Sequence, residues 1–363
     1  MKKKFFAFFL LVCFLMFSSS FIYSAGAQES GIDEKKIESE NAGNVNQSET
    51  RVIRDMRGRS VEIPVEISRA ASVFPYVSFI TLALGGGDVL VGIDSSSTGN
   101  ENLMRTYPEI KDVPAMGMFF NVNPESILEA DPQVVFTVNW DKDPDKTQSL
   151  LNVPVICVDL NLYKESIEFL SGIIGDSAES RANELISYYE EKKDLIKRSI
   201  SKADVNELTK VYIAGGKGIH STYGKESTWQ YEIADAGGIN VAADVFGGGA
   251  QEVSSEQIII WDPEVIVLDL SCPDSAEDIL NDEMFQDLSA VKSGRIYYAP
   301  AGFLDTFGRP HMESALARLW LADKLYPEEI NINITDEAKA FYLKFYGIEL
   351  SDSEISIILN PKK

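Results

Sequence analysis

The sequence predicts an α/β protein built from two related lobes with mostly parallel sheets. Three observations lead to this fold class. First, residues 122–136 are VNPESILEADPQVVF and residues 253–267 are VSSEQIIIWDPEVIV, so V-x-x-E-x-I-(I/L)-x-x-D-P-x-V-(I/V) recurs after 131 residues. Second, apolar strand patterns alternate with helical patterns in both halves of the chain, which is typical of parallel sheets covered by helices. Third, residues 177–203 form one long helical pattern without Gly or Pro, as expected of a connection between two lobes.

In the first half we expect a hairpin over residues 52–64 with Gly58 at the turn. A short strand over residues 71–74 precedes a helix over residues 77–84, which the following glycines end. The first copy of the repeat predicts a helix with Asn123 as N-cap and Pro124 at its first position. Further strands are expected over residues 89–93, 134–138 and 154–160.

The second half repeats this order. Strands are expected over residues 210–216, 265–270 and 295–300, with helices over 229–238 and 314–327 and a helical tail after them. A helix of 27 residues is about 40 Å long at 1.5 Å per residue, longer than one small lobe requires. We therefore interpret residues 177–203 as a rigid link between the lobes; the alternative is a surface helix of a single domain.

The N-terminus has the composition of a secretory signal peptide. Three lysines precede an apolar run of about 13 residues, and Ala25-Gly26-Ala27 follows as a cleavage site. A membrane anchor is the alternative, but the run is shorter than the roughly 20 residues that span a bilayer. We thus expect a periplasmic protein with a signal peptide at 1–27, a flexible linker at 28–50, lobes at 51–176 and 204–327 joined by 177–203, and a helical tail at 328–363.

The protein is acidic. Loss of the three leader lysines would take the formal net charge from −23 to −26. Such a charge repels nucleic acid and anionic membrane surfaces, so neither is expected as a partner. Beyond the leader only Cys157 and Cys272 remain, in different halves, and we expect no disulfide framework.

Several segments in order resemble the periplasmic iron-complex/cobalamin-binding proteins of ABC importers. They are DMRGRSVEIP, LALGGGDVLVGI, NPESILEADPQVVF, IADAGGINVA, SSEQIIIWDPEVIVL and AVKSGRIYYAP. The resemblance covers about residues 51–327, with the binding domain itself at about 69–328. It implies two Rossmann-like lobes joined by one rigid helix, with a ligand cleft between them. The segment GRPHMESALARLWLADKLYP and the tail are more similar to the subgroup that binds haem, metal chelates and molybdate.

The resemblance also gives the two repeated glutamates, Glu125 and Glu256, a role in docking to the permease. Each follows a predicted N-cap by two residues and so lies in the first turn of a helix. An acidic residue there also complements the helix dipole by roughly 0.3–1 kcal/mol, which is the alternative explanation.

Ligands of such sheets bind beyond the carboxyl ends of the strands, so the loops there supply the candidate binding residues. These candidates are Tyr76, Phe119, Trp140, His220, Tyr223, Arg309 and His311. The aromatic residues suit a bulky organic chelate, or pack the surface between the lobes. Arg309 suits an anionic group, or forms a structural ion pair. His220 and His311 are the only histidines and are candidate metal contacts, although a loop histidine is commonly just a polar surface residue.

We therefore expect a monomeric solute-binding protein with no intrinsic cofactor. It would deliver a metal complex (iron-siderophore, haem or corrinoid) to a permease dimer with ATPase subunits. The alternative ligand is a nickel chelate or a molybdate or tungstate oxyanion. An enzyme is less favoured, because the sequence has no G-x-S-x-G, H-E-x-x-H or P-loop motif. A non-transport sensor with the same fold is a third alternative.

Overall fold

The computed structural model describes residues 49–361 apart from 203–206 and 306. The expected signal peptide and nearly all of the expected linker lie outside the described residues. Within the described part, no helix has both the length and the apolar character to cross a bilayer.

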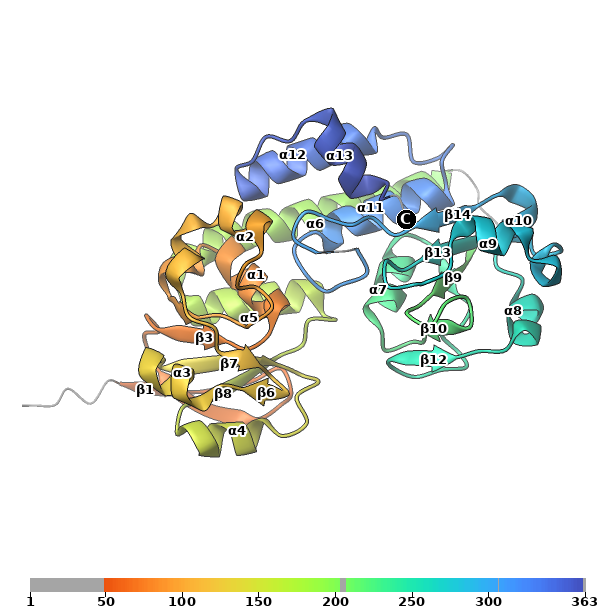
Figure 1. Ribbon diagram of the computed structural model, residues 1–363. Helices are drawn as coiled ribbons and strands as arrows, with labels where there is room; N and C mark the ends of the chain where they lie inside the picture. The colour runs from red at the N-terminus through yellow and green to blue at the C-terminus, as the bar shows by residue number, and fades with distance from the viewer. Residues whose placement is uncertain (1–48, 203–206, 306, 362–363) are drawn as a thin grey trace, which may run out of the picture. The chain divides into compact units, whose positions relative to one another are not determined.

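The first lobe is built on a parallel sheet in the order β4-β3-β7-β8 (Figure 1). Its strands are β3 (Ala70–Ser72), β4 (Leu90–Gly92), β7 (Val134–Val138) and β8 (Val155–Val158). Every residue of β7 and β8 is buried, as expected where helices cover both faces of a parallel sheet. The helices are α1 (Pro75–Ala83), α2 (Glu101–Thr106), α3 (Pro124–Ala130), α4 (Pro144–Leu151) and α5 (Tyr163–Ile174).

Two antiparallel hairpins accompany this sheet. The pair β1 (Thr50–Arg54) and β2 (Ser60–Pro64) turns at Gly58, whose φ of 84° favours glycine. The second pair, β5 (Gly117–Met118) and β6 (Asn121–Val122), comes directly before α3. Short 3₁₀ turns lie at Gly86–Asp88 and Pro108–Asp112.

The second lobe repeats the topology, with a parallel sheet in the order β11-β9-β13-β14. Its strands are β9 (Lys210–Ala214), β11 (Ile239–Asn240), β13 (Val265–Leu268) and β14 (Ile296–Tyr298). An antiparallel pair, β10 (Ser221–Tyr223) and β12 (Ala250–Glu252), comes before α8 as the β5–β6 pair does before α3. The helices are α7 (Thr228–Asp235), α8 (Ser255–Trp261), α9 (Ala276–Asn281) and α10 (Ser289–Ser293), with a 3₁₀ turn at Glu283–Phe285.

The two copies of the repeat form the same local structure. Both α3 and α8 have seven residues, begin with a side-chain cap from Asn123 or Ser254, and end at an aspartate in the left-handed region. These aspartates are Asp131 (φ 46°) and Asp262 (φ 43°). The predicted N-caps are confirmed.

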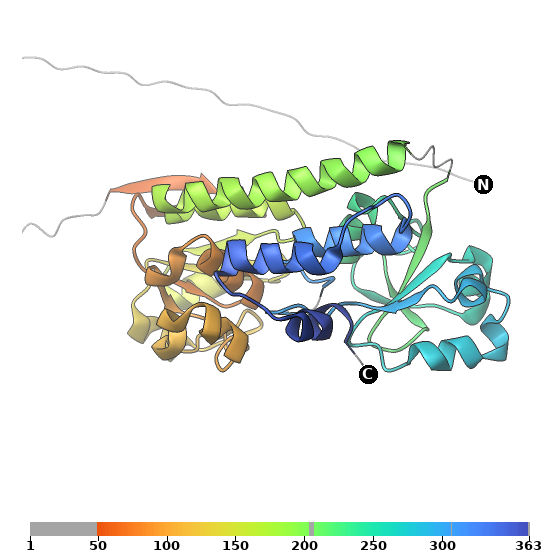
Figure 2. The same cartoon turned by 90° about the horizontal axis from the view of Figure 1, so that it is seen from above.

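The expected connecting helix is α6 (Asp176–Lys202), which is 27 residues long. It packs against α5 and against α11 (Ser314–Leu325), and α11 packs in turn against α7 and α12 (Ile334–Tyr346). Figure 2 shows α6 with α11 and α12 beside it. The chain closes with α13 (Asp352–Leu359). The expectation of two lobes with parallel sheets joined by a long helix is confirmed.

Some boundaries differ from the expected ones for local reasons. Helix α1 begins at Pro75, two residues early, because proline is well suited to a first helical position. Helix α7 ends at Asp235, before Gly237, which has a φ of 80°. The sequence analysis did not identify α2, α4, α5, α9 or α10. Cys157 and Cys272 are both free and buried.

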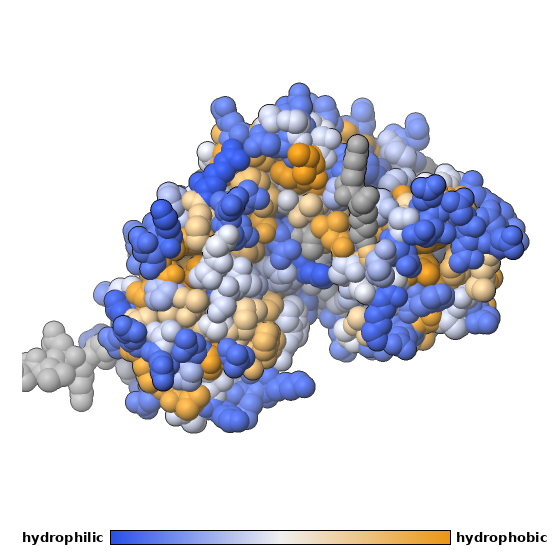
Figure 3. Space-filling model, in the orientation of Figure 1, coloured by the Kyte–Doolittle hydropathy of each residue, from blue (hydrophilic) through white to orange (hydrophobic). Residues whose placement is uncertain are grey.

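The main core extends from α1 and α5 through α6 and α11 to one face of the second-lobe sheet, and it includes the tail. A smaller core fills the other face of each sheet. Figure 3 shows hydrophilic residues over most of the visible surface, with apolar residues in scattered patches.

Candidate functional site

A pocket of about 440 Å³ lies between the carboxyl ends of the two sheets, which we call the interlobe pocket. It is lined by Phe74, Tyr76, Trp140 and Asn161 of the first lobe, by Tyr223, Glu226, Ser227, Thr228, Trp229 and Gly249 of the second, and by Gly308, Arg309 and Pro310. Its volume lies within the usual range for small-molecule sites, about 300–1,000 Å³.

The first lobe supplies an aromatic wall. Phe74 stands edge-on to Tyr76 and to Trp140, with ring centroids 5.3 and 5.4 Å away. The Tyr76 hydroxyl donates to the Asp305 carboxylate at 2.8 Å, a hydrogen bond between the first lobe and the loop that carries Arg309. Burial raises the pKa of Tyr76 far above its usual range, so this hydroxyl remains a donor.

The second lobe supplies polar groups from the start of α7. The Ser227 hydroxyl caps this helix by accepting from the Gln230 amide at 3.3 Å. Thr228, the first helical residue, donates its hydroxyl to the Asn161 side chain of the other lobe at 3.3 Å. The first amides of a helix lack intrahelical partners and attract negative charge, so the start of α7 favours an anion.

Arg309 is the one arginine or lysine that lines the interlobe pocket among the described residues. Its guanidinium is 3.5 Å from the buried Asp269 carboxylate, and its side chain keeps 30% of its surface exposed. Burial lowers the pKa of Arg309, but Asp269, Tyr76, Tyr223 and Asp305 outweigh it and raise the pKa overall. A charged, partly exposed guanidinium thus faces the pocket beside a helix start.

Asp269 is satisfied by other donors as well. It accepts from the Ser271 amide and hydroxyl at 2.9 and 2.6 Å and from the Trp229 indole at 3.2 Å. Asp269 therefore has donors besides Arg309. The Arg309 guanidinium donates no hydrogen bond of ordinary geometry to another described residue, so its donors can reach a ligand.

Four of the seven ligand-binding candidates, Tyr76, Trp140, Tyr223 and Arg309, line the pocket. Phe119 does not: it packs behind Phe74, with ring centroids 5.6 Å apart. His311 is fully buried against the Tyr76 ring, because its loop folds onto the first lobe.

His220 lies elsewhere, exposed on a shallow hollow with Lys217, Glu252, Val253 and Ser254. His220 directly precedes β10, and its carbonyl accepts a hydrogen bond from the Val253 amide, which directly follows β12. This pairing places His220 near the start of α8 and away from the interlobe pocket. The two histidines thus share no site. No group of three or more His, Cys, Asp or Glu able to hold a metal ion occurs among the described residues.

Sequence reasoning missed Asn161, Ser227, Thr228 and Trp229, whereas Phe74 ends a short expected strand, where one of the loops expected to line the cleft begins. The signal for the α7 residues was present: Ser227-Thr228 is a helix N-cap pattern at the start of an expected helix in the second lobe. Asn161 comes directly after the expected strand over residues 154–160, so the strand-end rule applied there as well would have found it.

Glu125 and Glu256 lie in the first turns of α3 and α8, and both are exposed. The Glu256 amide and the Ser254 hydroxyl donate to its carboxylate and lower its pKa. Neither glutamate lines the interlobe pocket. The two therefore do not form a catalytic pair in one site.

Residues 71–302 match the periplasmic binding protein family. The chain belongs to this family. Over 324 residues it is 26% identical to the molybdate-binding protein MolA of Haemophilus influenzae, covering 82% of this chain and 91% of that protein.

Two solved structures are similar over nearly their whole length. The Haemophilus influenzae MolA structure with bound molybdate has a TM-score of 0.68 at 26% identity, covering 83% of this chain and 99% of that one. A periplasmic solute-binding protein of Veillonella parvula also has a TM-score of 0.68, at 29% identity, covering 86% and 97%. These relatives are described as binding proteins, and this chain is a substrate-binding protein of the same family.

Proposed function

We propose that this protein captures a small, oxygen-rich anion outside the cytoplasm, either a metal oxyanion such as molybdate or a compact anionic metal complex, and delivers it to an ABC importer. The position of Arg309 beside the start of α7 in the interlobe pocket carries this proposal. A guanidinium and helix amides are the donors that recognise oxyanions most effectively. The similar MolA structure contains molybdate, which is consistent with this ligand class.

The aromatic wall supports a second candidate. Phe74, Tyr76 and Trp140 offer flat apolar surface to an iron-siderophore, haem or corrinoid. The oxyanion is favoured over these because neither histidine reaches the pocket to ligate a metal, and Phe119 does not add to the wall.

Calorimetric titration of the purified protein with molybdate, tungstate, a ferric siderophore and haem tests the ligand class. We expect molybdate and tungstate to bind, and Arg309→Gln to weaken both by about 10- to 100-fold, the effect of one or two charge-assisted hydrogen bonds. The matched control is Arg295→Gln, because Arg295 donates to the Lys324 and Leu325 carbonyls and does not line the pocket. Binding of haem or siderophore with no heat from either oxyanion would overturn the assignment.

Glu125 and Glu256 are proposed as contacts to a permease dimer that carries ATPase subunits, with the receptor acting as a monomer. Their support is exposure at equivalent helix starts in both lobes. Charge pairs of this kind orient an encounter more than they add affinity. Replacing both by arginine should abolish stimulation of the transporter ATPase while leaving ligand affinity unchanged.

Glu129→Arg is the control for docking, because this residue is also exposed on α3 but lies beyond its first turn. Equal loss of stimulation in the control and in the double variant would contradict the docking role.

Delivery also requires export. We propose that the signal peptide is cleaved after Ala27, which N-terminal sequencing of the mature protein would reveal.

A further inference from the structure

The loop that carries Arg309 has no regular secondary structure of its own. It consists, in its described part, of residues 299–305 and 307–313, between β14 and α11, and we call it the ligand loop. Arg309 and Gly308 reach the pocket from it, and its Asp305 accepts the Tyr76 hydroxyl. Something else must hold this backbone, since a free loop would lose the position of the guanidinium.

The buried carboxylate of Glu313 accepts hydrogen bonds from both the ligand loop and the C-terminal tail. Glu313 is fully buried and accepts from the Phe303 and Leu304 amides at 2.8 and 2.9 Å. It also accepts from the hydroxyls of Tyr342 and Tyr346 on α12 at 2.9 and 3.2 Å. Four donors thus meet one carboxylate, and two of them come from the tail.

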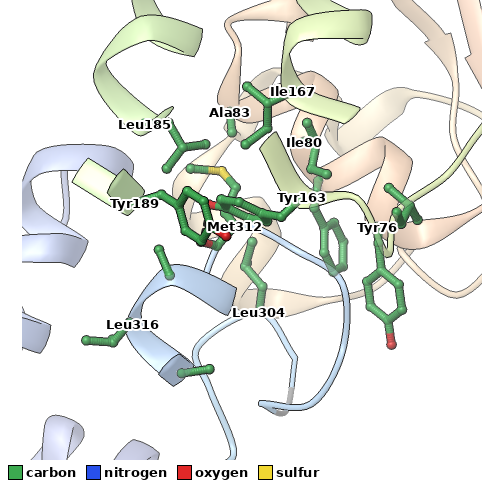
Figure 4. Packing of buried hydrophobic residues seen from close by; sticks show 14 of the residues in the cluster. Tyr76, Ile80, Ala83, Tyr163, Ile167, Leu185, Tyr189, Leu304, Met312 and Leu316 are labelled. Carbon is green, nitrogen blue, oxygen red and sulfur yellow. Dashed lines mark hydrogen bonds between the residues drawn. The ribbon is translucent and has the colours of Figure 1, made fainter. Parts of the chain in front are cut away.

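The tail also holds the beginning of the loop, because the Ala301 amide donates to the Ile358 carbonyl of α13 at 2.8 Å. The first lobe holds the same backbone through Asn102, whose amide donates to the Phe303 carbonyl at 2.7 Å, and through the Tyr163 hydroxyl, which donates to the Met312 carbonyl at 2.9 Å. Figure 4 shows Leu304 and Met312 pointing into the buried cluster that contains Tyr163.

The tail has its own attachment to the rest of the protein. The Tyr188 hydroxyl of α6 donates to Glu337 at 2.8 Å, and Lys192 pairs with the same carboxylate at 2.8 Å. Arg105 of the first lobe pairs with Glu354 of α13 at 3.1 Å. Because the tail is fixed to α6 and α2, it can serve as a support for the loop.

We propose that the C-terminal tail positions the ligand loop, with Tyr342 and Tyr346 acting through Glu313 as positioning residues for Arg309. The importance of Arg309 for the ligand rests on the proposed function, whereas the support of the loop by the tail does not. The tail is then part of the binding apparatus, although it touches no ligand.

The double variant Tyr342→Phe with Tyr346→Phe tests this, because it removes two hydroxyls and keeps the buried rings. The matched control is Tyr188→Phe, which removes a hydroxyl that bonds the same tail but not the loop. Hydrogen exchange of the Phe303 and Leu304 amides should become about tenfold faster or more in the double variant, and should remain as in the wild type in the control. A uniform increase over all amides, or no increase at these two, would overturn the proposal.

Affinity for sodium molybdate gives the second measurement. The affinity should fall by about tenfold in the double variant and should not fall in the control. The free energy of unfolding, followed by the melting temperature, should change less than the free energy of binding. If the wild type binds molybdate and the double variant binds it with the same affinity, the positioning role is refuted. If the wild type binds no molybdate while the two amides exchange faster as expected, the proposed function fails and the support of the loop by the tail stands.

Discussion

Helices α1 and α7 occupy equivalent places in the two lobes but begin with opposite chemistry. Helix α1 follows the inner strand β3, α7 follows the inner strand β9 after the short strand β10, and both helices begin at the interlobe pocket. The N-cap of α1 is Phe74, which makes no side-chain cap, and Pro75 removes an amide donor. The N-cap of α7 is Ser227, with Thr228 next. One lobe therefore offers an apolar helix start and the other a polar one, so an anion belongs on the second-lobe side.

The difference continues along the two helices when positions are counted from the N-cap. Two residues on, Tyr76 and Trp229 both line the pocket, and each donates to an aspartate. Five residues on, the first lobe has the buried Phe79 and the second has the buried Glu232. The two lobes thus share a topology, whereas this position is apolar in the first lobe and carries an ionisable carboxyl group in the second.

The largest effect is expected at the contact between the ligand loop and α7. Gly308 has a φ of 87°, and a Cβ atom there would overlap the Trp229 ring. Gly308→Ala should therefore cost about 2–5 kcal/mol in backbone strain and overpacking and weaken anion binding by about 100-fold. Gly249→Ala is the control, since Gly249 also lines the pocket with a φ of 76° but has nothing within 4 Å of a Cβ atom. Equal losses of affinity in calorimetry would show that strain alone explains the effect.

A second, smaller effect is a pH dependence at Glu232, whose equivalent in the first lobe is the non-titrating Phe79. Burial raises the pKa of Glu232 to about 7, against the lowering by Arg318 and by the Gly308 amide. Neither of its carboxylate oxygens makes a hydrogen bond of ordinary geometry within the described part of the chain, and Arg318 is 4.0 Å away and bonded to Asp235. The folded protein therefore holds the proton more tightly than the unfolded chain does.

The stability from this proton is fully present below the unfolded pKa of about 4.3 and is lost as the pH rises through about 7. Between pH 5 and pH 8 the wild type should lose up to about 3 kcal/mol relative to Glu232→Gln. Urea unfolding of both proteins across this range is the measurement. Parallel pH profiles would mean that Glu232 stays ionised in the fold.

Asp235→Asn serves as a comparison, because Arg318 and Lys193 lower the pKa of Asp235 despite burial. The stability that Asp235 contributes is therefore lost at low pH instead.

The smallest effect concerns the cap of α7. Ser227→Ala should cost about 1 kcal/mol of stability and weaken anion binding a few-fold, because the first turn of α7 would fray at the pocket. Ser254→Ala removes the equivalent cap of α8 and should destabilise by a similar amount without changing the affinity. If the two variants bind the anion equally well, the start of α7 is not part of the site.

The two-lobed fold could be predicted from the sequence, because the repeat, the helix caps and the helical periodicity of apolar residues in α6 are local signals. Strand-end loops also identified Tyr76, Trp140, Tyr223 and Arg309 as residues of one pocket. Packing decided the rest. The burial of His311 depends on how the ligand loop packs against Tyr76 of α1, and the position of His220 depends on the β10–β12 pairing. The Glu313 cluster joins residues up to 43 positions apart, and no local pattern indicates such a contact.

A crystal structure with tungstate, located by its anomalous scattering, tests the central claim most directly. We expect one tungsten atom in the interlobe pocket, with its oxygens about 2.7–3.0 Å from the Arg309 guanidinium and from the first amides of α7. Tungsten bound against Phe74 and Trp140 without Arg309, or a pocket filled by an organic chelate that excludes tungstate, would contradict the account.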